Sequence, residues 1–189
     1  MSAHSPTQTD LADLIVHLAR LGQSTAATPL TAAQWTALRY FAHANRLSRT
    51  PSAFSCFHAT TRGTASQTVK SLVELGLLAR QSHEHDGRST LLEVTEAGHA
   101  MLLRDPLEDL RKALARLAPE AQRALAASLG QVASGLAQLR ATPVFGTCVD
   151  CQHCQPAGDG HFCQQAQGYM SPDEMEAICV NFRPGNASL

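Results

Sequence analysis

The sequence predicts a mainly α-helical fold that contains a small β-wing and ends in a small metal-stabilised tail. Three observations support this prediction. Apolar residues recur at three- and four-residue spacing over much of residues 11–139, which is the period of an amphipathic helix. Two short apolar runs flank an Asp-Gly pair at 86–87, as they do in a tight β-hairpin. Five of the six cysteines lie between Cys148 and Cys179.

The first two helices are each expected to begin at a capping pair, in which a Thr is followed three residues later by a polar partner. The first pair spans residues 7–10 and precedes an apolar stripe over 11–21. The second pair, Thr31 and Gln34, opens a helix that should end near Asn45. Both helices therefore have a defined start and one apolar face.

Two further helices follow, with a short turn between them. Pro51 suits the first turn of a short helix over 52–59. A turn at 60–63 leads to a helix over 64–75, which ends at Gly76, a residue that favours the left-handed backbone of a helix end.

Two β-strands are expected at 77–81 and 89–94, one on each side of the Asp-Gly turn. Two neighbouring helices joined by a short glycine-containing turn and followed by a hairpin have the element order of a winged helix-turn-helix. The sequence therefore predicts this motif in the first half of the chain.

The long helices around the winged segment are expected to form a dimer interface. Helix resumes after Thr95, Pro106 kinks or restarts it, and Pro119 opens a last helix that ends near Arg140. A single winged domain is too small to bury the apolar faces of these helices and of the first helix, so a second copy should cover them. Packing within one chain is the alternative.

These elements divide the chain into four parts. They are an N-terminal dimerisation helix (1–29), a winged helix-turn-helix domain (30–100), C-terminal dimerisation helices (101–141) and a cysteine-rich metal-binding extension (142–189).

Charge and composition limit the function classes. The net charge is −1, but residues 31–92 hold seven bases and three acids and so carry +4, while the rest carries −5. Such local positive charge favours contact with nucleic-acid phosphates. The sequence has no apolar run of membrane-spanning length and no secretion signal, so a cytoplasmic protein is expected. It has no nucleophile with a paired base, no phosphate loop and no carboxylate pair, so an enzyme is not expected.

The helix over 64–75 has the polar side chains that a helix in the DNA major groove needs near its amino end. Past the hairpin tip, an arginine can reach a minor groove or a phosphate, and an aspartate two residues earlier can hold its guanidinium. The expected DNA-binding residues are Arg62, Thr64, Ser66, Gln67, Lys70, Ser71 and Arg88, with Asp86 as the support of the wing. A solvated helix face and an ordinary hairpin are the alternative.

The tail has the cysteine spacing of a metal site. Gaps of two residues separate Cys148, Cys151 and Cys154, and Cys163 and Cys179 follow after eight and fifteen more residues. A two-residue gap lets two thiolates turn onto one ion, and more distant cysteines complete four ligands. Free thiols or disulfides are the alternative, which a reducing cytoplasm disfavours.

The metal stays open between an iron-sulfur cluster and zinc, because both use the same thiolates. His153 and His161 are interpreted as merely polar. The acidic balance of the tail argues against a second DNA-reading module. Cys56, outside the tail, is interpreted as a core thiol.

The segments 30–35, 66–78 and 86–98 resemble those of the multiple-antibiotic-resistance-regulator (MarR) family, and the resemblance covers roughly residues 9–140. It implies a homodimer of winged helices that binds a palindromic operator and releases it when a ligand or an oxidant changes the half-site spacing. On this resemblance the helix from Thr64 reads the major groove and Arg88, supported by Asp86, is the wing arginine.

The segment 47–62 departs from the family pattern, because Cys56 and Phe57 stand where packing residues are usual. The tail is similar to cysteine-rich extensions on some regulators of this family, in which an aromatic replaces Cys154. That similarity implies a ligand set with Cys154 as a spare or alternate thiol. The set is Cys148, Cys151, Cys163 and Cys179.

Taken together, the sequence favours a transcriptional repressor whose operator binding is modulated by an iron-sulfur cluster or zinc in the tail. A repressor that answers to a small molecule, with a purely structural zinc tail and an apolar pocket between the helices, is one alternative. A redox or electron-transfer accessory protein that uses the winged helix for protein contacts is another, which the basic segment disfavours.

Overall fold

The computed structural model describes residues 10–23, 29–82 and 90–185. The Thr of the first expected capping pair and the hairpin tip, with Asp86 and Arg88, lie outside the described residues. Within them, no helix is long and apolar enough to cross a membrane.

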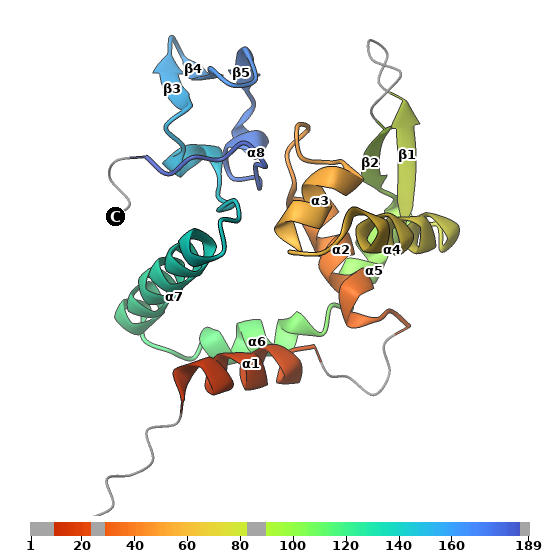
Figure 1. Cartoon of the computed structure of the whole chain (residues 1–189), viewed down its shortest axis with the longest axis vertical. Helices are drawn as coiled ribbons and strands as arrows, with labels where there is room; N and C mark the ends of the chain where they lie inside the picture. The colour runs from red at the N-terminus through yellow and green to blue at the C-terminus, as the bar shows by residue number, and fades with distance from the viewer. Residues whose placement is uncertain (1–9, 24–28, 83–89, 186–189) are drawn as a thin grey trace, which may run out of the picture.

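The winged helix-turn-helix order is confirmed (Figure 1). We call this part of the molecule the head. It consists of α2 (Ala32–His43), α3 (Pro51–Phe57), α4 (Arg62–Glu74), β1 (Leu78–Ser82), β2 (Thr90–Val94) and α5 (Glu96–Leu102). The two strands pair antiparallel, with Leu78 opposite Val94.

Threonine caps set the start of each helix in the head. Thr31 and Gln34 form the expected capping box of α2. Thr50 caps α3, and Thr61 caps α4 by accepting the N–H of Thr64. The prediction that the fourth helix begins at residue 64 is therefore wrong by two residues, because the cap is Thr61 and the first turn of α4 includes Arg62.

Glycines are required at two junctions of the head. Gly76 ends α4 with a φ of +70°, in the left-handed region that glycine occupies without strain. Gly98 in α5 passes so close to the base of the hairpin that a Cβ there would lie 2.3 Å from the carbonyl oxygen of Leu77. These two positions fix the hairpin against the helices on either side.

The core of the head is built on aromatic side chains from α2 and α3. Trp35, Tyr40, Phe41 and Phe54 are all at most 1% exposed. Tyr40 and Phe41 pack edge to face with ring centroids 5.2 Å apart. Aliphatic side chains of α4 and the hairpin close this core, and they are Ala65, Val69, Leu72, Leu77, Leu78 and Leu92.

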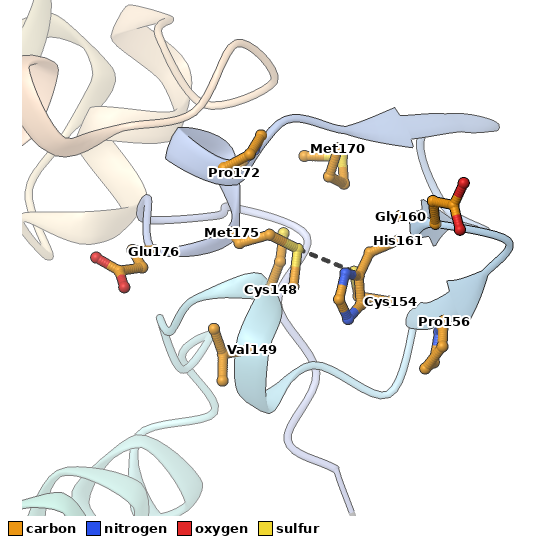
Figure 2. Close-up of a pocket in the computed structure, with 11 residues that line it drawn as sticks. Cys148, Val149, Cys154, Pro156, Gly160, His161, Met170, Pro172, Met175 and Glu176 are labelled. Carbon is orange, nitrogen blue, oxygen red and sulfur yellow. Dashed lines mark hydrogen bonds between the residues drawn. The ribbon is translucent and has the colours of Figure 1, made fainter.

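The tail contains regular structure that the sequence analysis did not predict. The 3₁₀ turn η1 (Cys148–Asp150) precedes an antiparallel sheet of β3 (Cys154–Ala157), β4 (Gly160–Cys163) and β5 (Gly168–Met170), and α8 (Pro172–Met175) follows. Figure 2 shows side chains from η1, this sheet and α8 gathered around one pocket.

Three helices, α1 (Leu11–Leu21), α6 (Leu107–Leu114) and α7 (Pro119–Leu139), lie outside the head (Figure 1). The side chain of Asp10 caps α1. None of these three helices has a buried residue within the described chain. The restart at Pro106 is confirmed, because α5 ends at Leu102 and α6 begins at Leu107.

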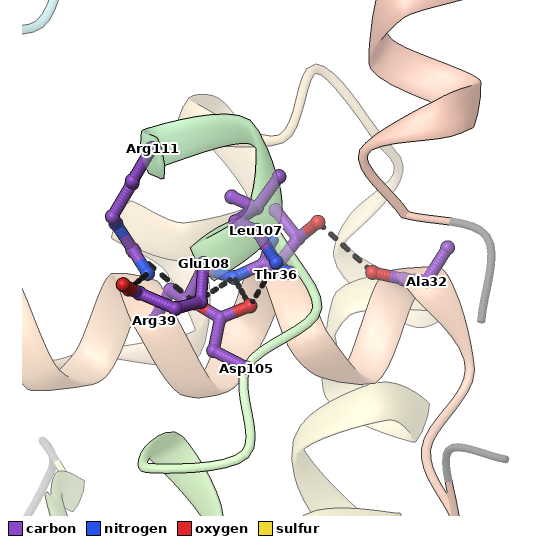
Figure 3. A network of polar contacts seen from close by, with 7 residues as sticks. All are labelled: Ala32, Thr36, Arg39, Asp105, Leu107, Glu108 and Arg111. Atoms are coloured by element: carbon purple, nitrogen blue, oxygen red, sulfur yellow. Dashed lines mark hydrogen bonds and ion pairs between the residues drawn. The ribbon is translucent and has the colours of Figure 1, made fainter. Parts of the chain in front are cut away.

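A buried carboxylate joins α6 to the head (Figure 3). Asp105 accepts hydrogen bonds from Nε of Arg39 on α2, at 2.9 and 3.1 Å, and from Nη2 of Arg111 on α6, at 3.1 Å. It also accepts the N–H of Leu107 at 2.9 Å, which starts α6. Burial alone would raise the pKa of Asp105, but the hydrogen bonds from Arg39 and Leu107 hold it below its usual value.

Asp105→Asn is expected to lower the free energy of unfolding by about 3 kcal/mol at pH 7, because the guanidinium of Arg39 stays buried without its counter-charge. The folded-state pKa is depressed, so this stability is present above the unfolded pKa of about 3.9 and is lost as the pH falls through the folded value. Urea denaturation of wild type and variant should give curves that converge below about pH 4. Asp109→Asn is the control, since Asp109 is 87% exposed and its pairing with Lys112 is screened. Equal losses from both variants would contradict this role of Asp105.

Candidate functional site

The polar face of α4 is exposed at most of the positions that the sequence predicted for DNA contact. Arg62, Thr64, Ser66, Gln67 and Lys70 are all exposed. The Lys70 ammonium lies 3.7 Å from the Glu74 carboxylate, but both side chains are about 60% exposed, so water screens this pair and leaves Lys70 available.

Ser71 departs from the expectation that it points outward. Its side chain is half-buried, and its hydroxyl accepts a hydrogen bond from Nε2 of Gln34 on α2. The α2 helix therefore covers this position, and Ser71 holds α4 against α2 rather than facing a groove.

Three of the bases in the positive segment are engaged within the chain. Arg39 pairs with the buried Asp105, and Arg49 lies 3.6 Å from Glu93. Arg46 pairs with Glu174 of the tail. The local charge of +4 thus overstates the free positive charge of the head, because pattern alone does not show which bases have partners.

Cys56 is exposed, so its interpretation as a core thiol is wrong. The buried face of α3 carries Ala53 and Phe54. Ser55 is buried as well, and Cys56 follows these three residues near the C-terminal end of α3, where its side chain is exposed.

The structure brings the five tail cysteines together. Cys148 packs with Cys163, and Cys151 packs with Cys179, in two adjacent buried clusters that Cys154 joins. Cys154 is half-buried, whereas the other four thiols are at most 8% exposed.

Short backbone turns set up the first three of these cysteines. The N–H of Cys151 donates to the carbonyl of Cys148 at 3.3 Å, and the N–H of Cys154 donates to the carbonyl of Cys151 at 3.0 Å. For Cys179, the last of the five cysteines, the backbone N–H donates to the carbonyl of Gly146 at 3.0 Å. A Cβ at Gly146 would lie 2.6 Å from the ring of Phe182, so only glycine allows this close approach.

Burial and neighbouring thiols raise the pKa of two of these cysteines. Burial, followed by the proximity of Cys179, Cys154, Cys163 and Cys151, raises the pKa of Cys148 to about 12. Burial and neighbouring Cys163 also raise the pKa of Cys154. Several thiols this close together lose their protons at the same time only beside a cation that compensates their negative charge. A metal ion bound by thiolates is such a cation. As placed, the described Cys, His, Asp and Glu side chains form no group of three or more that would hold a metal ion.

A pocket of about 640 Å³ opens beside the cysteines (Figure 2). Cys148, Cys154, His161 and Met175 line it, and the Cys154 thiol donates to the thioether of Met175 with the two sulfurs 3.7 Å apart. His161 thus faces a pocket with sulfur donors, while His153 does not line it.

The C-terminal segment docks on the turn between α2 and α3. The N–H of Ile178 donates to the carbonyl of His43 at 2.7 Å, and the N–H of Asn45 donates to the carbonyl of Ile178 at 3.0 Å. Two residues on, the N–H of Val180 donates to Oγ of Ser48 at 2.8 Å.

Cys179 lies between these two docking residues and faces the opposite way. Ile178 and Val180 pack against the core of the head, whereas Cys179 packs with Cys151 and Phe182. Successive side chains of an extended segment point to opposite faces, so one short stretch of backbone serves both the head and the cysteine cluster.

The segment between α2 and α3, on which the tail docks, also contacts the wing. The hydroxyl of Tyr40 donates to the carbonyl of Ser48 at 2.8 Å, and the N–H of Leu92 in β2 donates to the carbonyl of Arg49 at 2.8 Å. Oγ of Ser48 also donates to Oδ1 of Asn45 at 2.7 Å, and both side chains are buried. The turn therefore connects the cysteine-rich tail with a strand of the wing.

An ion pair adds to this contact. Arg46 pairs with Glu174 of α8 and donates to the carbonyl of Tyr169 at 3.2 Å. Burial alone would raise the pKa of Glu174, but hydrogen bonds from Ser171 and Arg46 hold it below its usual value. Because the Arg46 side chain is 44% exposed, this pair orients the tail more than it stabilises it.

A polar cavity lies at the junction of α2, α5 and α6, whereas the sequence analysis considered an apolar pocket between the first, second and long helices. The cavity there has a volume of about 330 Å³ and is lined largely by ionisable side chains. They include Arg39, His43, His99, Asp105 and Arg111.

Comparisons with known proteins agree with this architecture. Residues 28–89 match the model of the MarR family. The structure is similar to that of the transcriptional regulator SlyA, with a TM-score of 0.57 and 21% identity over 69% of this chain and 96% of that one. It is also similar to a probable transcriptional regulator from Pseudomonas aeruginosa, with a TM-score of 0.50 and 27% identity over 65% of this chain and 92% of that one. No curated protein matches the chain.

A third similar structure is the MepR–DNA complex of S. aureus, with a TM-score of 0.54 and 19% identity over 69% of this chain and 99% of that one. These solved structures extend over about two thirds of this chain. The match in fold therefore supports the winged helix and leaves about a third of this chain without a counterpart.

Ser48→Ala is expected to lower the free energy of unfolding by about 1–3 kcal/mol, because it leaves the half-buried N–H of Val180 and the buried Oδ1 of Asn45 without their partner. Urea denaturation measures this loss. Ser52→Ala is the matched control on the exposed face of α3 and should change stability by less than about 0.5 kcal/mol. A Ser48→Ala variant as stable as the control would show that the tail does not dock on this turn in solution.

Proposed function

We propose that this chain, whose residues 28–89 match the MarR family, is a DNA-binding transcriptional regulator, a repressor, that binds a palindromic operator as a homodimer. The observation that carries the proposal is the exposed polar face of α4 at the position of the recognition helix in a winged helix-turn-helix.

The side chains on α4 divide into two kinds of DNA contact. The amide of Gln67 suits bidentate hydrogen bonding to the edge of an adenine, and the hydroxyls of Thr64 and Ser66 suit base edges or phosphates. Lys70 and Arg62 suit phosphates at the borders of the groove. MepR of S. aureus, which shares the fold, was solved in complex with DNA.

Repeated selection from a pool of random duplex DNA tests this function. Wild type is expected to enrich a palindromic sequence. Lys70→Ala should weaken binding across sequences and reduce the salt dependence by about one phosphate contact, whereas Gln67→Ala should cost about 1–3 kcal/mol and relax specificity at one base pair. Arg88→Ala should weaken binding without unfolding the protein.

Arg140→Ala is the control for these variants, because Arg140 is exposed at the far end of α7. Binding measured at one salt concentration should be unchanged in this control. A selection that enriches no sequence, or α4 variants that bind like the control, would overturn the proposed function.

The homodimer is proposed from the apolar faces of α1, α6 and α7. The α7 positions 125, 129, 132 and 136 follow helical spacing and form one stripe. The exposed apolar side chains on the three helices and their connections are Leu14, Ile15, Leu18, Leu21, Leu114, Leu117, Leu125, Leu129, Val132 and Leu136, each at least 37% exposed. So many exposed apolar side chains on three helices are rare on a monomer, and a second copy supplies a matching apolar face.

Leu129→Glu is expected to shift the protein from dimer to monomer, because it places a charge in the centre of the apolar stripe. Size-exclusion chromatography with light scattering should give twice the chain mass of 20.2 kDa for wild type and a single chain mass for the variant. Gln131→Glu adds the same charge at an exposed position off the stripe and should stay dimeric. A monomeric wild type would contradict the dimer.

We further propose that Cys148, Cys151, Cys163 and Cys179 hold zinc or an iron-sulfur cluster. Their burial and their packing in two adjacent clusters support this set, and Cys154 differs from them because it is half-buried and donates to Met175. When bound, the metal neutralises the thiolates and stabilises the tail. Since Cys179 belongs to the segment docked on the α2–α3 turn, metal occupancy is linked to the head and hence to operator binding.

Metal analysis of protein purified without oxygen tests this set. We expect about one zinc ion per chain, or iron with sulfide, and a loss of most bound metal in Cys151→Ser. Cys56→Ser removes an exposed thiol far in sequence from the tail and should keep the wild-type metal content. Wild type without stoichiometric metal, or a Cys151→Ser variant that keeps it, would exclude the proposed site.

A further inference from the structure

We propose that Cys154 and Cys163 are a modification site at which a peroxide forms a disulfide between strands β3 and β4. The inference rests on the proposed function, because Cys163 is one of the four thiols assigned to the metal. The disulfide would withdraw Cys163 from that set and release the metal.

The register of the β3–β4 hairpin places these two thiols opposite each other. Cys154 pairs with Cys163 at the open end, and Ala157 pairs with Gly160 next to the turn. All six cysteines are free thiols in the structure.

The hydrogen-bond pattern shows which type of pair this is. The N–H of Gln164 donates to the carbonyl of His153 at 2.8 Å, so residues 153 and 164 form a hydrogen-bonded pair. Bonded and non-bonded pairs alternate along an antiparallel ladder, so Cys154 and Cys163 form a non-hydrogen-bonded pair. Pro156 lies two residues on, at the next non-bonded position, where its missing N–H costs no ladder bond.

A non-hydrogen-bonded pair is the position at which opposite side chains come closest. Its Cα atoms are about 4.5 Å apart, and its Cβ atoms are separated by about 4.5–5.5 Å. A disulfide needs a Cα separation of about 4.4–6.8 Å. The Cα separation of this pair therefore suits the bond, and its Cβ atoms, at the short end of their range, reach the separation of about 3.5–4.5 Å that a disulfide also needs.

The two thiols differ in access, which sets the order of the reaction. Cys154 is half-buried and lines the pocket of about 640 Å³ together with His161 and Met175. Cys163 is 4% exposed and does not line the pocket. Cys148 also lines the pocket but is 3% exposed, so an oxidant that enters the pocket meets the more exposed Cys154 first.

The chemistry balances with a peroxide as the two-electron oxidant. The sulfur of Cys154 attacks the peroxide, the O–O bond breaks, and a sulfenic acid forms with release of an alcohol or water. The sulfur of Cys163 then attacks the sulfur of Cys154 and displaces hydroxide, which leaves as water after taking up a proton. The two sulfurs together lose two electrons, and three cysteines of the proposed set remain as ligands.

Zinc-loaded protein treated with hydrogen peroxide tests the site by two independent readouts. Peptide mapping under non-reducing conditions should find the Cys154–Cys163 disulfide, and a zinc-sensitive dye should report release that dithiothreitol and added zinc reverse. Cys154→Ser should release zinc at least tenfold more slowly than wild type. Cys56→Ser, which removes the exposed thiol of α3, should behave like wild type.

A disulfide that joins a different pair of cysteines, or a Cys154→Ser variant that releases zinc at the wild-type rate, would overturn the proposal. Its failure is distinguishable from failure of the proposed metal site, because peptide mapping needs no metal. If the protein binds no zinc, the metal site fails, and a Cys154–Cys163 disulfide mapped in metal-free protein still supports the modification site.

Discussion

The hydrogen bonds between the turn at 43–48 and the C-terminal segment at 178–180 hold together two parts of the chain that are far apart in sequence. They use backbone groups of His43, Asn45 and Ile178, so substitution of surface side chains does not remove them. They also satisfy buried polar groups, which would otherwise destabilise the α2–α3 turn. The position of the tail beside the head depends on this contact.

The same contact lies between the cysteine cluster and the core of the head. The alternation of Ile178, Cys179 and Val180 places one side chain in the cysteine cluster and two on the core of the head. From there, Ser48 and Arg49 continue the connection to Tyr40 and β2. A few adjacent hydrogen bonds thus connect the cysteine cluster with the wing.

Much of the head could be predicted from the sequence, because its determinants are local. Threonine caps, the left-handed Gly76 and the helical spacing of apolar residues act within a few positions of one another. The predictions that were wrong concern side chains whose exposure or pairing is set by contacts between distant segments. Ser71 is covered by α2, Arg46 is paired with Glu174 of the tail, and Cys56 falls off the buried face of α3.

That the cysteines of the tail lie close together could be predicted from the sequence, but the secondary structure of the tail could not. Spacing alone indicated that the five thiols converge, whereas the β3–β4 hairpin and the docking of Ile178 depend on pairing between segments that sequence periodicity does not register. The difference between Cys154 and the other four thiols is likewise a matter of burial, which only the folded chain determines. Local signals for the hairpin were nevertheless present. Gly158 and Asp159 are the two residues between the paired Ala157 and Gly160, and Gly158 has a φ of 59°, as a two-residue hairpin turn requires.

Hydrogen–deuterium exchange, compared between metal-loaded and chelator-treated protein, tests the link between tail and head most directly. If the docked segment couples them, removal of the metal should speed exchange in the tail and also in peptides that contain Asn45 and Leu92, whose amides donate to Ile178 and Arg49. Peptides from α7 should change little. Faster exchange confined to the tail, with the turn at 43–48 and β2 unaffected, would contradict the account.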